Sequence, residues 1–283
     1  MPETPSHSKD DLRPRHLVRH GPWWGEFAFT PGETRSLHLG PLRLWLNRQT
    51  DEWRMYFLQG TDPFAPEFMA LEVQTDDEGE IDSAAKARRF GFGQSPERIH
   101  LSPKLPDRPM VVRPDALLSV PSGATIELYV SYPVWLELVF GMPPVARESI
   151  AIFQSTESWF GPNPTEGELC YASRSALCST FTELLLRPHR VITKLRVKNR
   201  GDAALDIERI KIPLRHLSIF ADEDARLWTE TVSLVGGETD ERTSMRILEG
   251  PPAQAKNADC LRPPEVRPDA NLMERALHAL FFT

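Results

Sequence analysis

The residues best suited to ligand binding or chemistry are concentrated between positions 155 and 171. The predicted binding residues of this stretch are Trp159, Phe160, Glu166, Glu168 and Tyr171. Aromatic rings can stack on a ligand, and carboxylates can accept its hydrogen bonds. No catalytic motif surrounds them. The sequence therefore predicts a binding surface here and names no catalytic residue.

Cys170 offers an alternative in which the same stretch is catalytic. A nucleophilic cysteine needs a base at hydrogen-bond distance, and His189 is the candidate base. Nothing in the sequence places His189 beside Cys170, which lies in an expected strand, so a buried structural thiol is favoured. A glycosidase pair could join Glu166 or Glu168 to Glu157 or Glu183. With 40 acidic residues in the chain, such pairs arise easily by chance.

Seven tryptophans suggest a second kind of binding, because indole rings can stack on sugar rings. Most of them (Trp45, Trp53, Trp135, Trp228) lie in expected strands, where burial is the default. The remaining three (Trp23, Trp24, Trp159) lie near turns, and packing within the protein is favoured for them as well. A carbohydrate-binding or carbohydrate-active protein remains the alternative function.

The sequence predicts no cofactor and no metal. It contains no Walker loop, no G-x-S-x-G and no H-E-x-x-H, and the acidic run at 76–82 fails the spacing of an EF-hand. The cysteines at 170, 178 and 260 lack the C-x-x-C spacing of zinc sites. Binding to either kind of group therefore has no motif behind it.

Charge and hydropathy limit the partners and the location. The net charge is −7, from 33 basic and 40 acidic residues, which disfavours nucleic acid as a partner. No apolar run approaches the roughly 20 residues that cross a bilayer, so we expect no integral membrane protein. An odd number of cysteines and a polar N-terminus indicate a reduced, cytoplasmic setting.

The elements that must position these residues are short. With 26 prolines in 283 residues, long helices would be broken repeatedly. The pattern predicts an all-β protein of two β-sandwich-like, immunoglobulin-like halves at 21–142 and 145–240, with a linker at 141–144. A flexible arm at 1–20 precedes them. A Pro-rich tether and a short amphipathic helix follow at 250–283.

Two stretches give the clearest strand signals. Residues 37–47 alternate apolar and polar side chains around a kink at Gly40-Pro41, and residues 52–59 are the expected hairpin partner. Residues 191–198 and 204–212 also alternate, on either side of the turn-forming segment 199–202. They predict a hairpin or a tight sheet corner. Residues 181–186 are expected to form a further strand.

The C-terminal segment has apolar residues at helical spacing. Its predicted docking residues are Leu272, Met273, Leu277, Leu280 and Phe281. An apolar helical stripe must be covered, either by the body of the protein or by a partner. Docking on the body of the protein is favoured for such a stripe, and a protein partner or homo-oligomer formed through this helix is the predicted interaction if it docks in trans.

Three segments resemble a known prokaryotic family, the domain of unknown function four-three-two. They are LPDRPMV at 105–111, YVSYPVW at 129–135, and WFGP at 159–162 followed by GELCY at 167–171. The resemblance implies a β-rich cytoplasmic protein with no assigned activity. It suggests association with a membrane protein, because genes of this family often lie beside small mechanosensitive-channel genes. It supplies no functional residues.

Together these observations predict a non-catalytic cytoplasmic binding or regulatory protein, such as a protein-interaction module. The question of enzymatic activity stays open and leans towards none, because no catalytic motif is found.

Overall fold

Strands are the main elements of this protein. The computed structural model describes residues 21–73, 81–161, 165–173, 177–236, 244–267 and 277–278. Within these residues there is no helix of seven or more residues; the helical pieces are three-residue 3-10 turns at Phe181–Glu183, Leu214–His216 and Ala253–Ala255. The predicted all-β class is confirmed. The predicted arm at 1–20 lies outside the described residues.

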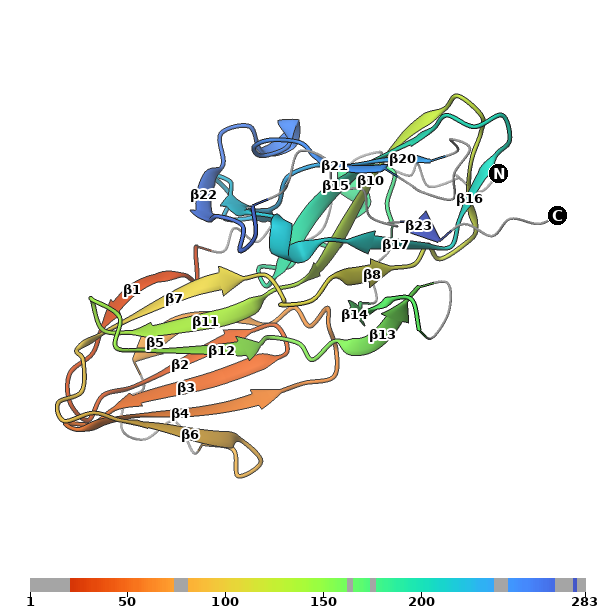
Figure 1. The fold of residues 1–283 in the computed structure, drawn as a ribbon. Coiled ribbons are helices and arrows are strands. Elements are labelled where there is room, and N and C mark those ends of the chain that lie inside the picture. The colour runs from red at the N-terminus through yellow and green to blue at the C-terminus, as the bar shows by residue number, and fades with distance from the viewer. Residues whose placement is uncertain are drawn as a thin grey trace, which may run out of the picture.

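Two antiparallel sheets are built from the first 151 residues (Figure 1). Sheet A has the order β1 (Gly25–Ala28), β7 (Arg98–Lys104), β11 (Trp135–Phe140), β12 (Ala146–Ala151). Sheet B has the order β5 (Phe68–Val73), β2 (Thr34–Leu39), β3 (Leu42–Arg48), β4 (Glu52–Gln59), β6 (Lys86–Gly91). The rings of Trp53 in sheet B and Phe140 in sheet A lie 5.5 Å apart, so the two sheets share a core.

The other sheets combine strands from both parts of the sequence. Sheet E contains β10 (Thr125–Pro133), β15 (Arg190–Asn199), β18 (Ile219–Ala221), β19 (Leu227–Trp228), β20 (Val232–Gly236), β21 (Ser244–Ile247) and β22 (Asp259–Arg262). Sheet C has the order β13 (Thr156–Phe160), β14 (Glu168–Ala172), β8 (Met110–Val112), β17 (Arg209–Ile212), β23 (Leu277–His278). Sheet D pairs β9 (Leu118–Val120) with β16 (Leu205–Ile207).

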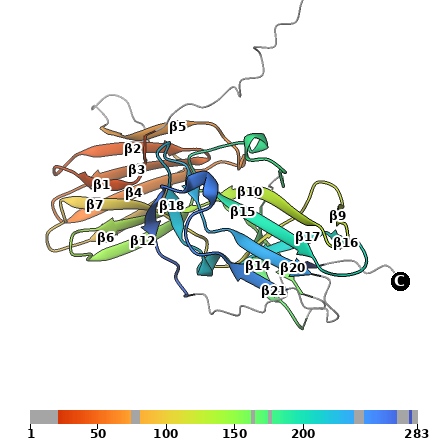
Figure 2. The same cartoon turned by 90° about the horizontal axis from the view of Figure 1, so that it is seen from above.

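Strand pairing crosses the expected division at 142–145. Three strands before that division pair with strands after it. β8 pairs with β14 and β17, β9 pairs with β16, and β10 pairs with β15. The expected linker at 141–144 belongs to the turn of the β11–β12 hairpin, where the amide of Val145 donates to the carbonyl of Phe140. Seen from above, β10 and β15 run side by side (Figure 2).

Buried polar residues hold β15 to the loop after β4. The guanidinium of Arg190 is buried, donates to Ser131 and to the carbonyl of Pro63, and lies 4.2 Å from the ring centroid of Phe64. His189 is also fully buried, with Nε2 3.1 Å from the Pro63 carbonyl. The apolar core is continuous from sheet B to sheet E around these groups.

Several sequence predictions need correction. The kink at Gly40-Pro41 is the turn of a β2–β3 hairpin, while the predicted pairing of the following strand with 52–59 is confirmed. Of the two structures predicted around 199–202, the sheet corner is confirmed over the hairpin, because β15 enters sheet E and β16 and β17 enter sheets D and C. Phe181–Glu183 is a 3-10 turn where a strand was predicted.

The C-terminal region also differs from the prediction. The expected tether contains a 3-10 turn and β22, which pairs with β18. Leu277–His278 is a strand that pairs with β17, so the predicted helix is wrong at these two residues. The other predicted docking residues (Leu272, Met273, Leu280, Phe281) lie outside the described residues.

Candidate functional site

The predicted binding stretch forms the β13–β14 hairpin at one edge of sheet C. Trp159 lies opposite Leu169, and Phe160 lies opposite Glu168. Because cross-strand partners share a face of a sheet, these two pairs point to opposite sides. Trp159 is 42% exposed and Leu169 39% exposed, whereas Phe160 is buried with Val111 and Cys170. The five predicted residues therefore do not converge on one point.

Tyr171 anchors the hairpin to the segment before β8. Its side chain is buried, and its hydroxyl donates to Oδ1 of Asp107 at 3.1 Å. Burial and this hydrogen bond raise the pKa of Tyr171. The guanidinium of Arg108 lies 5.5 Å from the tyrosine ring centroid and pairs with Glu157. The contacts of Tyr171 therefore support the β13–β14 hairpin.

Glu168 has a structural partner as well. Its carboxylate is 3.0 Å from Nζ of Lys211 on β17, and Lys211 is almost fully buried. The same ammonium lies 5.8 Å from the ring centroid of Phe160, and the guanidinium of Arg209 lies 5.9 Å from that ring on the same strand. Glu166 is exposed in the connection between the two strands. This face of sheet C thus leads from the hairpin to Arg209.

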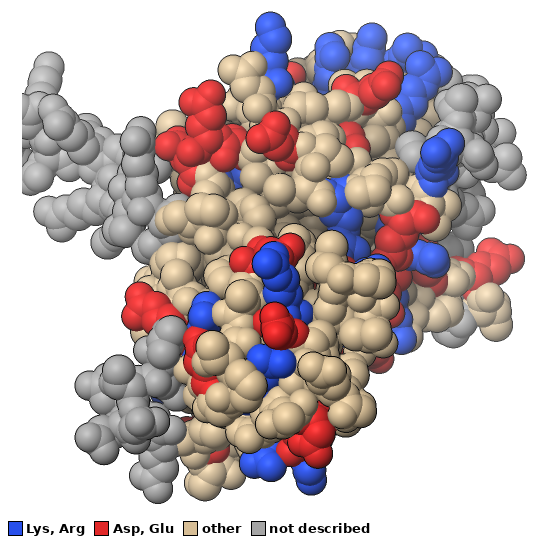
Figure 3. Space-filling view, turned by 90° about the vertical axis from the view of Figure 1, so that its left-hand side faces the viewer, with Lys and Arg blue, Asp and Glu red and all other residues tan. Residues whose placement is uncertain are grey.

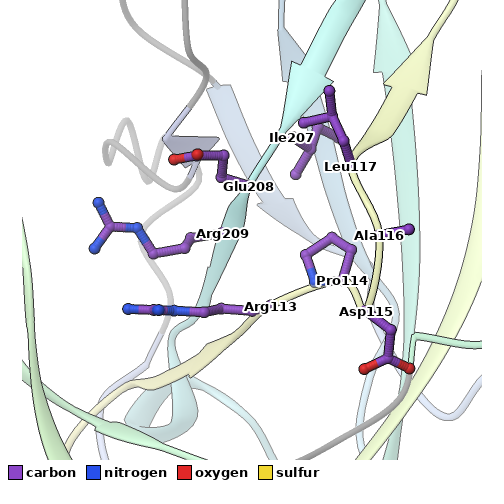
Figure 4. Close-up of a pocket in the computed structure, with 8 residues that line it drawn as sticks. All are labelled: Arg113, Pro114, Asp115, Ala116, Leu117, Ile207, Glu208 and Arg209. Atoms are coloured by element: carbon purple, nitrogen blue, oxygen red, sulfur yellow. The ribbon is translucent and has the colours of Figure 1, made fainter.

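A pocket with a volume of about 330 Å³ opens beside Arg209 (Figure 4). It is lined by the segment after β8 and by the junction of β16 and β17, namely by Arg113, Pro114, Asp115, Ala116, Leu117, Ile207, Glu208 and Arg209. Figure 4 shows the side chains of Arg113 and Arg209 lying alongside each other and pointing the same way. Pro114, Leu117 and Ile207 form an apolar wall on the other side.

The register explains why the two arginines meet. Val112 lies opposite Ile210 in the β8–β17 pair, so Arg113 and Arg209 occupy the next opposed positions. Neither guanidinium lies within 4 Å of a carboxylate among the residues that the structure describes, although Asp115 and Glu208 line the same pocket. Figure 3 shows acidic and basic side chains interspersed over much of the opposite end of the molecule.

The cysteine–histidine pair is not assembled. Cys170 packs against Phe160 and Val111, and no contact joins His189 to it within the described ranges. Burial lowers the pKa of His189 to about 3, and its Nδ1 has no hydrogen-bond partner. No group of three metal-ligating side chains occurs in the described part of the chain.

Of the tryptophans, Trp159 is the one that the hairpin exposes. Trp23, Trp45, Trp53 and Trp228 are buried, and Trp24 and Trp135 are half-buried. The prediction of buried strand tryptophans holds for three of the four positions. Trp23, expected near a turn, donates from its indole nitrogen to the carbonyl of Pro188 at 2.9 Å.

Sequence reasoning missed Arg113 and Arg209. One signal was present: Arg209 follows Leu205 and Ile207 at alternate positions, where a further apolar residue is expected. A charged side chain at a position of a strand where the alternation calls for an apolar residue indicates that the strand changes sheets there or contributes to a binding site. No such signal marks Arg113 in the sequence. Arg113 lies beside Arg209 only because β8 pairs with β17, which is far away in the sequence.

The fold and the site define an all-β protein with an arginine-lined pocket at the end of a mixed sheet. The chain belongs to the family described as a protein of unknown function (DUF432), whose model matches residues 23–282. The predicted family membership is thus confirmed. Comparison with curated proteins and with solved structures found no match. No helix within the described ranges is long and apolar enough to cross a membrane.

Proposed function

We propose that this protein is a non-catalytic binding or regulatory protein of the cytoplasm, and that it contacts its ligand at the end of sheet C. The observation that carries the proposal is the pocket lined by the segment after β8 and by the β16–β17 junction. The β13–β14 hairpin of the same sheet exposes the indole of Trp159 on the face opposite to Phe160. Large apolar side chains are exposed at this end, namely Trp159, Leu169 and Leu117. Concave sites with apolar walls and a few polar groups are typical of ligand-binding surfaces.

The roles of the chemistry-bearing residues support binding over catalysis. The Glu168 carboxylate neutralises a buried ammonium, the Tyr171 hydroxyl holds Asp107, and the Cys170 thiol is buried in a small apolar cluster. A general acid or base must be free to exchange a proton with a substrate. Each of these groups instead has a structural contact that its reaction would disrupt.

The proposal includes a rigid scaffold and a partner. Two sandwich-like, immunoglobulin-like halves are the proposed scaffold, and the contact of Trp53 with Phe140 between sheets A and B supports the first of them. A protein partner, such as a second copy or a membrane protein, is proposed at the C-terminal segment. The pairing of β23 with β17 supports a role for this segment beside the pocket.

Hydrogen–deuterium exchange tests the location of binding. The purified protein is compared with and without an extract of the cells in which its gene is native, separated into small-molecule and macromolecular fractions. Protection of 111–113, 157–161, 165–171 and 207–211 supports the proposal, and protection confined to sheets A and B contradicts it. Mass spectrometry of the released ligand tests the non-catalytic part, because a binding protein returns its ligand unchanged.

Carbohydrate binding is the second candidate, and the exposed indole of Trp159 favours it. A sugar stacking on this ring would change the fluorescence of one tryptophan, since the others are buried or half-buried. Titration with a panel of oligosaccharides should give a saturable change that Trp159→Phe removes. A flat titration for every sugar excludes this candidate.

A further inference from the structure

The two arginines of the pocket carry like charges at neighbouring positions of sheet C. Like charges at directly opposed positions of neighbouring strands repel each other, and Arg113 and Arg209 occupy such positions. Arg209 gains a contact with the Phe160 ring, at 5.9 Å, but no carboxylate within 4 Å in the described structure. Two guanidinium groups at the mouth of a pocket, without a carboxylate within 4 Å in the described structure, are suited to hold a bound anion.

Neighbouring cations are already neutralised, which singles out this pair. Lys211 is bound by Glu168 at 3.0 Å, and Arg108 is paired with Glu157. The chain as a whole is acidic, with a net charge of −7. The pair is therefore a local feature of one pocket, and it is not part of a generally basic surface.

The surroundings of the pair restrict the ligand. Two adjacent guanidinium forks can hold a tetrahedral dianion with several charge-assisted hydrogen bonds, whereas a single carboxylate would leave one fork unfilled. The apolar wall of Pro114, Leu117 and Ile207 suits a carbon skeleton. Asp115 and Glu208 would repel further anionic groups and can accept hydrogen bonds from hydroxyls.

We propose that Arg113 and Arg209 bind the phosphate group of a small organic phosphate monoester, whose carbon part lies on the apolar wall of the pocket. The volume of about 330 Å³ is at the lower end of the range for small-molecule sites. This inference rests on the proposed function, since it names the ligand class of the same surface.

Isothermal titration of the full chain with phenyl phosphate tests the proposal. Inorganic phosphate tests the phosphate without a carbon part, and benzoate tests the same ring with a carboxylate in place of the phosphate, all at equal ionic strength. We expect one saturable site for phenyl phosphate, with weaker binding of both other probes. Arg209→Gln and Arg113→Gln should each weaken binding at least tenfold, and Arg209→Lys should fall between Gln and wild type. Arg196→Gln is the matched control, because Arg196 is an exposed arginine on β15 outside the pocket.

Each opposite outcome overturns a part of the proposal. Absence of saturable phenyl phosphate binding, or equal weakening by Arg196→Gln, refutes the site. Benzoate binding as tight as phenyl phosphate refutes the phosphate, and equally tight inorganic phosphate refutes the organic part. Urea unfolding of each variant confirms that it is folded. If exchange protection at sheet C appears with cell extract while phenyl phosphate fails to bind, the proposed function stands and this inference falls.

Discussion

Replacing Gly40 by alanine should be one of the most damaging single changes in this protein. Gly40 has φ +58, in the left-handed region, at the turn of the β2–β3 hairpin. A Cβ built on it would lie 2.2 Å from Cε1 and 2.3 Å from Nδ1 of His189. The imidazole cannot retreat easily, because it is fully buried and its Nε2 contacts the Pro63 carbonyl.

The expected cost follows from two separable terms. A non-glycine residue in the left-handed region costs about 1–2 kcal/mol, and overpacking a rigid core costs about 1–3 kcal/mol. Alanine recovers about 0.4–1 kcal/mol by lowering the entropy of the unfolded chain. We therefore expect Gly40→Ala to lower the free energy of unfolding by about 1–5 kcal/mol, measured by urea unfolding with linear extrapolation.

Two other glycines separate the terms. Gly123 has φ +72 but nothing within 4 Å of a built Cβ, so Gly123→Ala should show the backbone cost alone, about 1 kcal/mol. Gly91 has neither feature, and Gly91→Ala should change stability by at most about 1 kcal/mol, in the stabilising direction. In a double-mutant cycle with His189→Ala, the double variant should be about 1–3 kcal/mol more stable than additivity predicts. If Gly40→Ala costs no more than Gly123→Ala, or if the cycle shows no coupling, the packing argument is wrong.

Three further predictions concern ionisable side chains. Burial lowers the pKa of His189 from 6.5 to about 3. As the pH falls below 6.5, the unfolded chain therefore binds a proton at this position that the folded protein does not bind. The free energy of unfolding, measured in urea, should then fall by up to about 1.4 kcal/mol per pH unit between pH 6 and 5. His189→Gln should flatten this dependence of stability on pH. His38→Gln is the control, because His38 is a half-buried histidine whose pKa is also lowered by burial. An unchanged pH dependence in His189→Gln would refute the assignment to His189. Glu168→Gln should cost about 1 kcal/mol by removing the carboxylate from the buried Lys211, less than for a fully buried pair because Glu168 is half exposed; full stability of this variant would contradict the reasoning. In native protein, iodoacetamide should label Cys260, the exposed thiol, and mass spectrometry should find the two buried thiols labelled more slowly than in urea.

The sequence predicted strands better than it predicted their partners. Alternation in the sequence identified β3, β4 and β15, although most residues of β3 and of β15 are buried. The partner of β3 was predicted correctly since a short turn leaves little choice. The partner of β15 was not determined by its neighbours: β15 pairs with β10 on one side and with β19 and β20 on the other. Such pairing depends on the shape of the whole core.

The candidate site shows the same limit. The stretch containing Trp159 was found from composition, although its β13–β14 hairpin was not predicted, and Phe160 leads to the pocket through its contact with Arg209. The pocket itself joins Arg113 to a residue almost one hundred positions later, through the pairing of β8 with β17. The C-terminal segment was predicted as a helix from its apolar spacing, but at Leu277–His278 an available edge of β17 provides backbone hydrogen bonds that favour a strand.

The pairing of β10 with β15 has a consequence for the synthesis of the chain. The hydroxyl of Tyr132 on β10 is hydrogen-bonded to that of Thr193 on β15, 61 positions later. At about 5–20 residues per second, a ribosome needs several seconds to deliver this partner. During that time the apolar residues of β10 have emerged without the strand that will cover their edge. The nascent protein is therefore an expected client of chaperones that hold unpaired strands, and a chain released early would lack the centre of sheet E.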